Sequence, residues 1–165
     1  PGQTLLFMGS EFAQRKEWNS KTSLEWDHLN HAPHLQVSEM LTQLNKLYTS
    51  TSALYEIDHS HDGFQWLECE DADQSIISFV RYDKKGKEIV VMCNFTPIPR
   101  SRHRFGMPSS GKWSEIFNTD SAQWGGTNLS NQGELSTENI PWHHRDSSIE
   151  VKLPPLSVVI FQKVS

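Results

Sequence analysis

The sequence lacks the features that mark several classes of protein. Its two cysteines, Cys69 and Cys93, are too few for the disulfide framework of a small secreted domain. No run approaches the roughly 18 apolar residues of a membrane-spanning helix, and no basic stretch followed by an apolar core resembles a secretory leader. We therefore expect a cytoplasmic protein with free thiols and no membrane partner.

Concentrated positive charge is also missing. The formal net charge is −5, and the densest group of lysines is the run Asp83-Lys84-Lys85-Gly86-Lys87. A nucleic-acid partner would need a basic stripe that neutralises several phosphates, so none is expected. His28, His31 and His34 are evenly spaced, but Pro33 interrupts them and no cysteine or carboxylate follows at a ligand spacing. We expect neither a metal nor a cofactor.

The residues that are present predict a packed, mainly β protein. The apolar run Thr4 to Met8, between two glycines, is typical of a strand buried on both faces in a parallel sheet. Residues 10–30 are polar with scattered aromatics, which favours a long loop. An amphipathic stripe from Val37 to Tyr48, with Pro33 at its start, predicts a helix over residues 33–49.

After Ile57 the periodicity changes to that of strands. Six short runs separated by turn residues indicate an antiparallel sandwich, and Gly86 suits the turn of a hairpin. The runs are Phe64–Cys69, Ser75–Tyr82, Glu88–Phe95, Lys112–Asn118, Ser148–Leu153 and Leu156–Gln162. Alternation with polar neighbours places Ile149, Val151 and Leu153 in the sandwich core, and the same reasoning places Val158 and Ile160 there.

Several motifs together resemble bacterial glycogen branching enzymes of the α-amylase superfamily. The first segment, PGQTLLFMGSEF, is similar to the superfamily's eighth barrel strand, and EFAQRKEWN with SLEW is similar to the loop that follows it. The resemblance continues in order through DGFQWL, FVRYDKKGKEIVVMCNFTPIPR, GKWSEIFNTD, GGTNLSNQG and LPPLS. It departs at Ser10, where many relatives have Asn, and at Trp124, where Tyr is common.

The resemblance implies a piece of a larger enzyme. Residues 1–60 would be the last strand, loop and helix of a truncated (β/α)8 barrel, and residues 61–165 the antiparallel β-sandwich that follows it. The parent would cleave an α-1,4-glucan and transfer the chain to a 6-hydroxyl through a glycosyl intermediate on a carboxylate. Its catalytic carboxylates would lie on earlier strands, so the resemblance assigns no catalytic residue here and implies an inactive fragment.

Two residues of the loop are the candidates for contact with α-glucan in the parent's cleft. Glu11 follows the end of the predicted barrel strand, so it is placed to line the cleft or to orient a neighbour. The ring of Trp18 could stack on a sugar or could pin the loop to the barrel. Trp26 is expected to pack.

Two further functions remain open. The sandwich could itself be a glucan-binding module that grips oligosaccharide through Trp66, Trp113, Trp124 or Trp142. The chain could instead be the tail of a debranching or trehalose-releasing relative.

The first strand poses a separate question, because its barrel neighbours would be absent. Such a strand would be disordered, dock on the sandwich or pair with a second copy of the chain. We expect the last of these, a homodimer caused by truncation.

Overall fold

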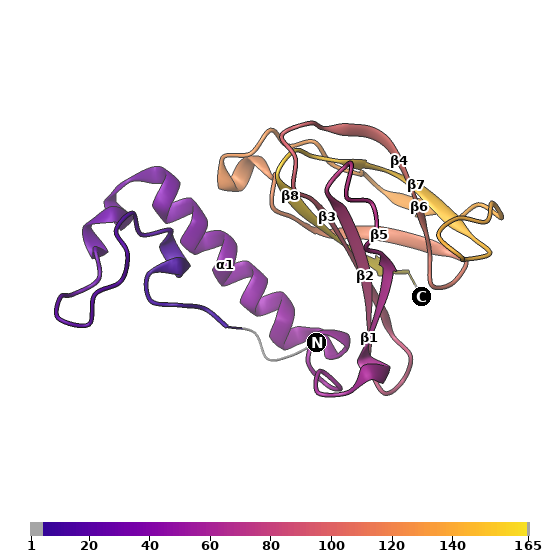
Figure 1. Ribbon diagram of the computed structural model, residues 1–165, viewed down its shortest axis with the longest axis horizontal. Helices are drawn as coiled ribbons and strands as arrows, with labels where there is room; N and C mark the ends of the chain where they lie inside the picture. Colours follow the sequence, from indigo (N-terminus) through magenta and orange to yellow (C-terminus); the bar gives the residue numbers. More distant parts are fainter. Residues whose placement is uncertain (1–4, 165) are drawn as a thin grey trace.

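The computed structural model describes residues 5–164, which form a mainly antiparallel β fold with one long helix. A six-stranded sheet has the order β1-β2-β3-β8-β5-β6, and β4 pairs with β7 in a second, two-stranded sheet (Figure 1). The strands are β1 (Phe64–Glu68), β2 (Ile76–Tyr82), β3 (Glu88–Asn94), β4 (Arg100–Gly106), β5 (Lys112–Asn118), β6 (Glu134–Ser136), β7 (Ser148–Leu153) and β8 (Ser157–Lys163). The helix α1 spans Ala32–Ser50, and short 3-10 helices occupy Ser10–Phe12, Trp26–Asn30, Ser52–Leu54, His61–Gly63 and Ala122–Trp124.

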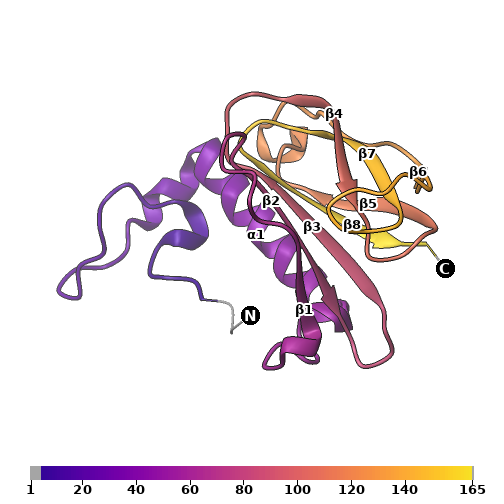
Figure 2. The ribbon, with the colours of Figure 1, turned by 45° about the vertical axis from the view of Figure 1, so that its right-hand side comes forward.

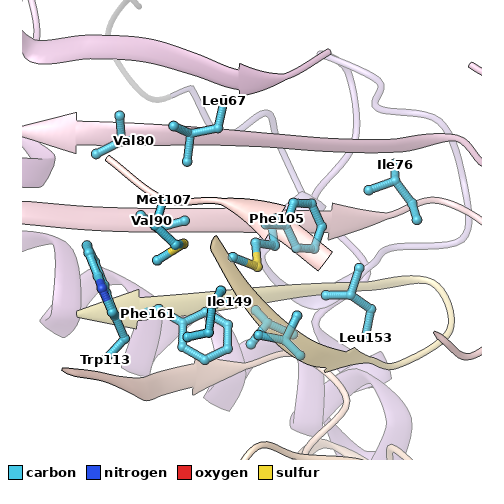
Figure 3. Close-up of a cluster of buried hydrophobic side chains, with 13 residues drawn as sticks. Leu67, Ile76, Val80, Val90, Phe105, Met107, Trp113, Ile149, Leu153 and Phe161 are labelled. Atoms are coloured by element: carbon cyan, nitrogen blue, oxygen red, sulfur yellow. The ribbon is translucent and has the colours of Figure 1, made fainter. Parts of the chain in front are cut away.

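The main core lies between the two sheets. Phe105, from β4, and Ile149, from β7, face Val90 and Phe161 of the large sheet, and all four side chains are buried (Figure 3). Trp113 closes the same cluster at one end and is fully buried. Burial of this apolar area is the main force that holds the sandwich together.

Helix α1 covers the opposite face of the large sheet (Figure 2). Pro33 lies in its first turn, where a missing N–H is tolerated. Leu44 and Tyr48 pack with the 3-10 helix Ser52–Leu54 over Val91 and Ile160. The large sheet therefore has apolar neighbours on both faces.

Arg81, on β2, fastens the segment that joins the helix to the sheet. Its guanidinium donates to the Asp58 carboxylate at 2.5 Å and to the carbonyl oxygens of Leu54 and Gly63, each at 3.1 Å. The arginine and aspartate side chains are largely buried. Their charges are thus paired and bonded inside the junction, as buried charges require.

The structure confirms the predicted helix and all six predicted strands to within a residue or so at each end. Gly86 has a φ of 77°, as the hairpin between β2 and β3 requires. Two strands were missed. β4 reads RSRHRFG, with little apolar alternation, and β6 has three residues.

Residues 5–8 of the predicted first strand form no strand in this chain and are exposed, while Thr4 lies outside the described residues. No other described strand pairs with them, and an unpaired strand has no ladder to hold it. That strand was predicted for the barrel of the parent, so it stays a prediction. The assignment of Val158 and Ile160 to the core between the sheets is wrong, because both side chains pack on the α1 side of the large sheet. The residues of β8 that face the sandwich core are Val159 and Phe161.

Candidate functional site

The loop that follows residue 8 is shaped by one buried aromatic residue. Gly9 and Ala13, which flank the 3-10 helix Ser10–Phe12, both have positive φ angles, of 89° and 54°. Between them the Phe12 ring is buried, and the Phe12 carbonyl accepts a hydrogen bond from Nδ1 of His34 on α1 at 2.8 Å. These contacts fix the start of the loop to the helix.

Glu25 braces the rest of the loop. Its carboxylate bonds the Lys16 ammonium at 2.9 Å and accepts from the Lys16 backbone N–H, while its own N–H donates to the side-chain oxygen of Gln14 at 2.9 Å. The hydrogen bond from Lys16 lowers the pKa of the Glu25 carboxyl below its usual value. Residues 14–25 therefore form a closed loop, with Trp18 near its outer end.

The two residues predicted to contact glucan, Trp18 and Glu11, lie in different surroundings. Trp18 is 44% exposed, meets the Phe7 ring edge to face at 5.4 Å, and lines an open hollow of about 550 Å³. Glu11 does not line that hollow, and one of its carboxylate oxygens is buried without a partner among the described residues. A buried acceptor without a donor is costly, so Glu11 is suited to a further group that donates to it.

The predicted packing role of Trp26 has partial support, because its ring contacts Phe12 at 5.3 Å but is half exposed. The nearby histidines belong to the same assembly. The rings of His28 and His34 stack at 4.5 Å, and Nδ1 of His34 is hydrogen-bonded to the Phe12 carbonyl.

Within residues 5–164, no group of three potential ligands is placed to hold a metal ion. No helix in the same range is long and apolar enough to cross a membrane.

The four tryptophans suggested for glucan binding on the sandwich differ in exposure. Trp113 is fully buried in the core, so its predicted contact with glucan is wrong. Trp66 and Trp142 are about half exposed, and Trp124 is partly exposed. Sequence alone could not separate Trp66 from Trp113, because an aromatic residue on a strand suits either face, and Trp124 and Trp142 lie outside the strands, where no alternation predicts exposure.

Trp66 borders a hollow of about 420 Å³ that His143 and Glu68, which contact each other, also line. There Nε2 of His143 lies 3.0 Å from the Glu68 carboxylate, and Nδ1 accepts a hydrogen bond of 3.4 Å from the Gly106 N–H. Burial lowers the pKa of His143 below its ordinary value, although the Glu68 charge opposes that effect. This pair holds residues 142–145 against β1.

A further polar hollow lies beside Trp124, one of the four tryptophans suggested for glucan binding. It lies at the end of β5 and includes Asn118 and Asn128 in its lining. Sequence reasoning named only Trp124 here, whereas the segments GKWSEIFNTD and GGTNLSNQG, which supply most of the other lining residues, were used for the resemblance and not for a site.

Residues 66–164 match the model of the family described as alpha amylase, C-terminal all-beta domain. A 1,4-alpha-glucan branching enzyme of Aquifex aeolicus is 47% identical over 160 residues, which cover 96% of this chain and 25% of that protein. The corresponding enzyme of Thermosynechococcus vestitus is 44% identical over 163 residues, with 98% and 21% covered. The chain thus spans about a quarter of the length of these relatives.

Among solved structures, the pullulanase SAP of Group B Streptococcus aligns with a TM-score of 0.52 at 20% sequence identity. The alignment covers 87% of this chain and 18% of the pullulanase chain. At this level of identity the likeness shows a shared fold.

Proposed function

The chain belongs to the family of alpha amylase C-terminal all-beta domains, and on that premise we propose that its parent protein is a 1,4-α-glucan branching enzyme. The observation that carries the proposal is the identity of 47% to the Aquifex aeolicus enzyme over nearly the whole chain. That similarity includes the loop and helix before residue 66, where the match to the domain family begins. The parent would act on α-glucan, in the cytoplasm.

Within that enzyme, residues 1–60 would complete the catalytic barrel and residues 61–165 would form the sandwich beside it. The arrangement of the described residues supports this division. α1 rests on the sandwich through Leu44 and Tyr48, whereas the loop before it extends away from the sheets (Figure 1). A loop that projects from a rigid support is suited to line a substrate cleft.

Glu11 and Trp18 are proposed to face that cleft, in a supporting and not a catalytic role. The buried, unpartnered oxygen of Glu11 would receive a donor from the barrel. The half-exposed ring of Trp18 would offer an apolar face to a glucosyl unit. The carboxylates that perform the reaction must flank a single glycosidic bond, and a barrel supplies such residues from the ends of several strands. They would therefore come from the parent's earlier strands.

A chimera tests the parent function. The matching carboxyl-terminal segment of the Aquifex aeolicus enzyme would be replaced by residues 1–165, and branching would be followed by iodine staining. We expect the chimera to branch amylose, the shortened enzyme without either segment to be inactive, and residues 1–165 alone to match a no-protein blank. A folded but inactive chimera, or activity of the isolated chain, would contradict the proposal.

A further inference from the structure

We infer that the hollow beside Trp124 is a binding subsite for a short segment of α-glucan, separate from the cleft proposed above. The hollow has a volume of about 230 Å³ and lies where β5 leads into the 3-10 helix Ala122–Trp124. The inference rests on the proposed function, which supplies the substrate class. It adds a second place where the same polymer is held.

Internal hydrogen bonds preorganise the wall of the hollow for a ligand. The buried Asp120 carboxylate accepts from the Thr127 N–H at 3.0 Å, from the Thr127 hydroxyl at 2.6 Å and from the Leu129 N–H at 3.1 Å. Asn118 donates to the Leu129 carbonyl at 2.9 Å. The loop over residues 119–130 is therefore held from within, so that a ligand meets a surface with little ordering cost.

Trp124 provides an aromatic platform on this wall. Its indole N–H donates to the Asn118 carbonyl at 3.1 Å, and its ring stacks on Phe117 with centroids 6.3 Å apart and an angle of 23°. The polar end of the indole is thus already satisfied, and the ring remains partly exposed. A ring held this way can contact the apolar face of a pyranose.

Uncharged polar groups surround the platform. Asn128 uses its side-chain oxygen to accept from the Ala122 N–H, but its NH₂ group has no acceptor within residues 5–164. The Gln123 amide and the Ser130 hydroxyl likewise make no side-chain hydrogen bond within that range. Asn128 also holds a φ of 64°, a conformation that its neighbours must maintain.

The charge of the lining selects the ligand class. Among the described residues no lysine or arginine lines this hollow, and the one carboxylate there, that of Glu115, accepts hydrogen bonds from Asn118 and Asn131. The exposed groups are therefore an aromatic ring with neutral donors and acceptors. That combination suits an uncharged, polyhydroxylated molecule and offers nothing to a phosphate.

The hollow also continues in a direction that suits a polymer. Asn128 and Ser130 line both this hollow and a larger one of about 540 Å³, whose rim includes Arg102 and Lys152. A glucan that stacks on Trp124 could thus extend across residues 128–132. Because the first hollow is smaller than the roughly 300–1,000 Å³ of a typical ligand pocket, each segment should bind weakly.

The test is a titration of residues 1–165 with maltoheptaose, followed by calorimetry and by the NMR signals of the tryptophan indoles. We expect binding in the roughly millimolar range, a shift of the Trp124 signal, and about tenfold weaker binding for Trp124→Ala. Trp124→Phe should recover most of that loss. Trp142→Ala, which removes an exposed tryptophan from another loop, should change the affinity less than about twofold.

Asn128→Gly serves as a second variant, because glycine adopts positive φ and keeps the loop's backbone. It should weaken binding by about threefold while leaving the thermal unfolding curve close to that of the unchanged chain. Binding that survives Trp124→Ala but is lost in Trp66→Ala would overturn the subsite, as would the absence of heat at on the order of 10 mM sugar. Neither result affects the iodine assay of the chimera, so failure of the subsite and failure of the proposed function are distinguishable.

Discussion

Ile149 shows how much a single core side chain contributes. It projects from β7 into the space between the sheets and is almost fully buried (Figure 3). Ile149→Ala should lower the free energy of unfolding by about 2–4 kcal/mol, because it removes buried methylene groups and leaves a cavity. Urea unfolding measures the change. Ile98→Ala, at an exposed position, should stay within about 0.5 kcal/mol, and equal losses for the two variants would refute the assignment.

The surroundings of Asp83 predict that the free energy of unfolding depends on pH. Burial disfavours its charged form, but the Ser52 hydroxyl at 2.5 Å and the N–H groups of Lys87 and Lys85, each at 2.8 Å, outweigh that effect. Together they lower the pKa of Asp83 below its ordinary value. Its contribution is therefore present above the unfolded-state pKa, and it is lost as the pH falls through the folded-state pKa.

The measurement is the melting temperature of the chain and of Asp83→Asn between neutral and acidic pH. We expect the variant to be less stable at neutral pH and to lose less on acidification. A variant whose curve runs parallel to that of the unchanged chain would show that Asp83 does not contribute to this dependence.

At the scale of elements, Arg81 is the link between the helical segment and the sheet. Arg81→Ala would leave the Asp58 carboxylate and two carbonyl oxygens without their donor. Loss of one member of a buried ion pair costs about 3–5 kcal/mol, and we expect a destabilisation of that order. Hydrogen exchange should report faster opening of residues 51–63 than of β3.

Arg102→Ala is the matched control, because Arg102 also bonds a carboxylate, that of Glu150 at 2.7 Å, but its own side chain is largely exposed. Its removal should cost no more than about 1 kcal/mol. If the two arginine variants were equally destabilised, the buried pair would not be the link described.

The elements also show where sequence reasoning succeeded and where it failed. β3 and β7 were predictable, because apolar runs and strict alternation each predict strands. β4 was not predictable, because its arginines and His103 leave Phe105 as the one buried apolar ring, and a single apolar residue shows no alternation. In β8 the continuous run from Val158 to Phe161 carries no alternation, so the sequence could not show which face meets the core. Of the candidate sites, Trp18 and Trp124 were both named from the sequence, and the role of Trp18 stays a prediction. The hollow around Trp124 could not be predicted, because tertiary hydrogen bonds of Asn118 and Asp120 shape it.

At the scale of the whole molecule, the exposed apolar start of the chain bears on association. Leu5 is 85% exposed, and Leu5 and Leu6 border an apolar hollow of about 420 Å³ between α1 and the sheet. We propose that residues 5–8, an exposed apolar strip, pair with a second copy of the chain when the rest of the parent is absent. Light scattering at on the order of tens of micromolar chain should show a dimer.

The control is the double variant Leu5→Gln with Leu6→Gln, which should be monomeric. A shortened chain that begins at Asp58 is less suitable, because loss of α1 would expose Val91 and Ile160 on the sheet. A monomeric unchanged chain would refute the proposal and leave docking of the strip on its own sheet as the explanation.

The position of β8 has a consequence for the order in which the molecule assembles. Within residues 5–164 β8 is the last strand, yet it lies between β3 and β5 at the centre of the large sheet, where Val90 pairs with Phe161. The β1-β2-β3 and β5-β6 portions therefore cannot join until the far end of the chain arrives. Pairings between such distant residues slow folding, and until β8 arrives the edge of β3 has unpaired backbone N–H and C=O groups. The rate at which this protein reaches its native state should accordingly be set by the insertion of a single strand.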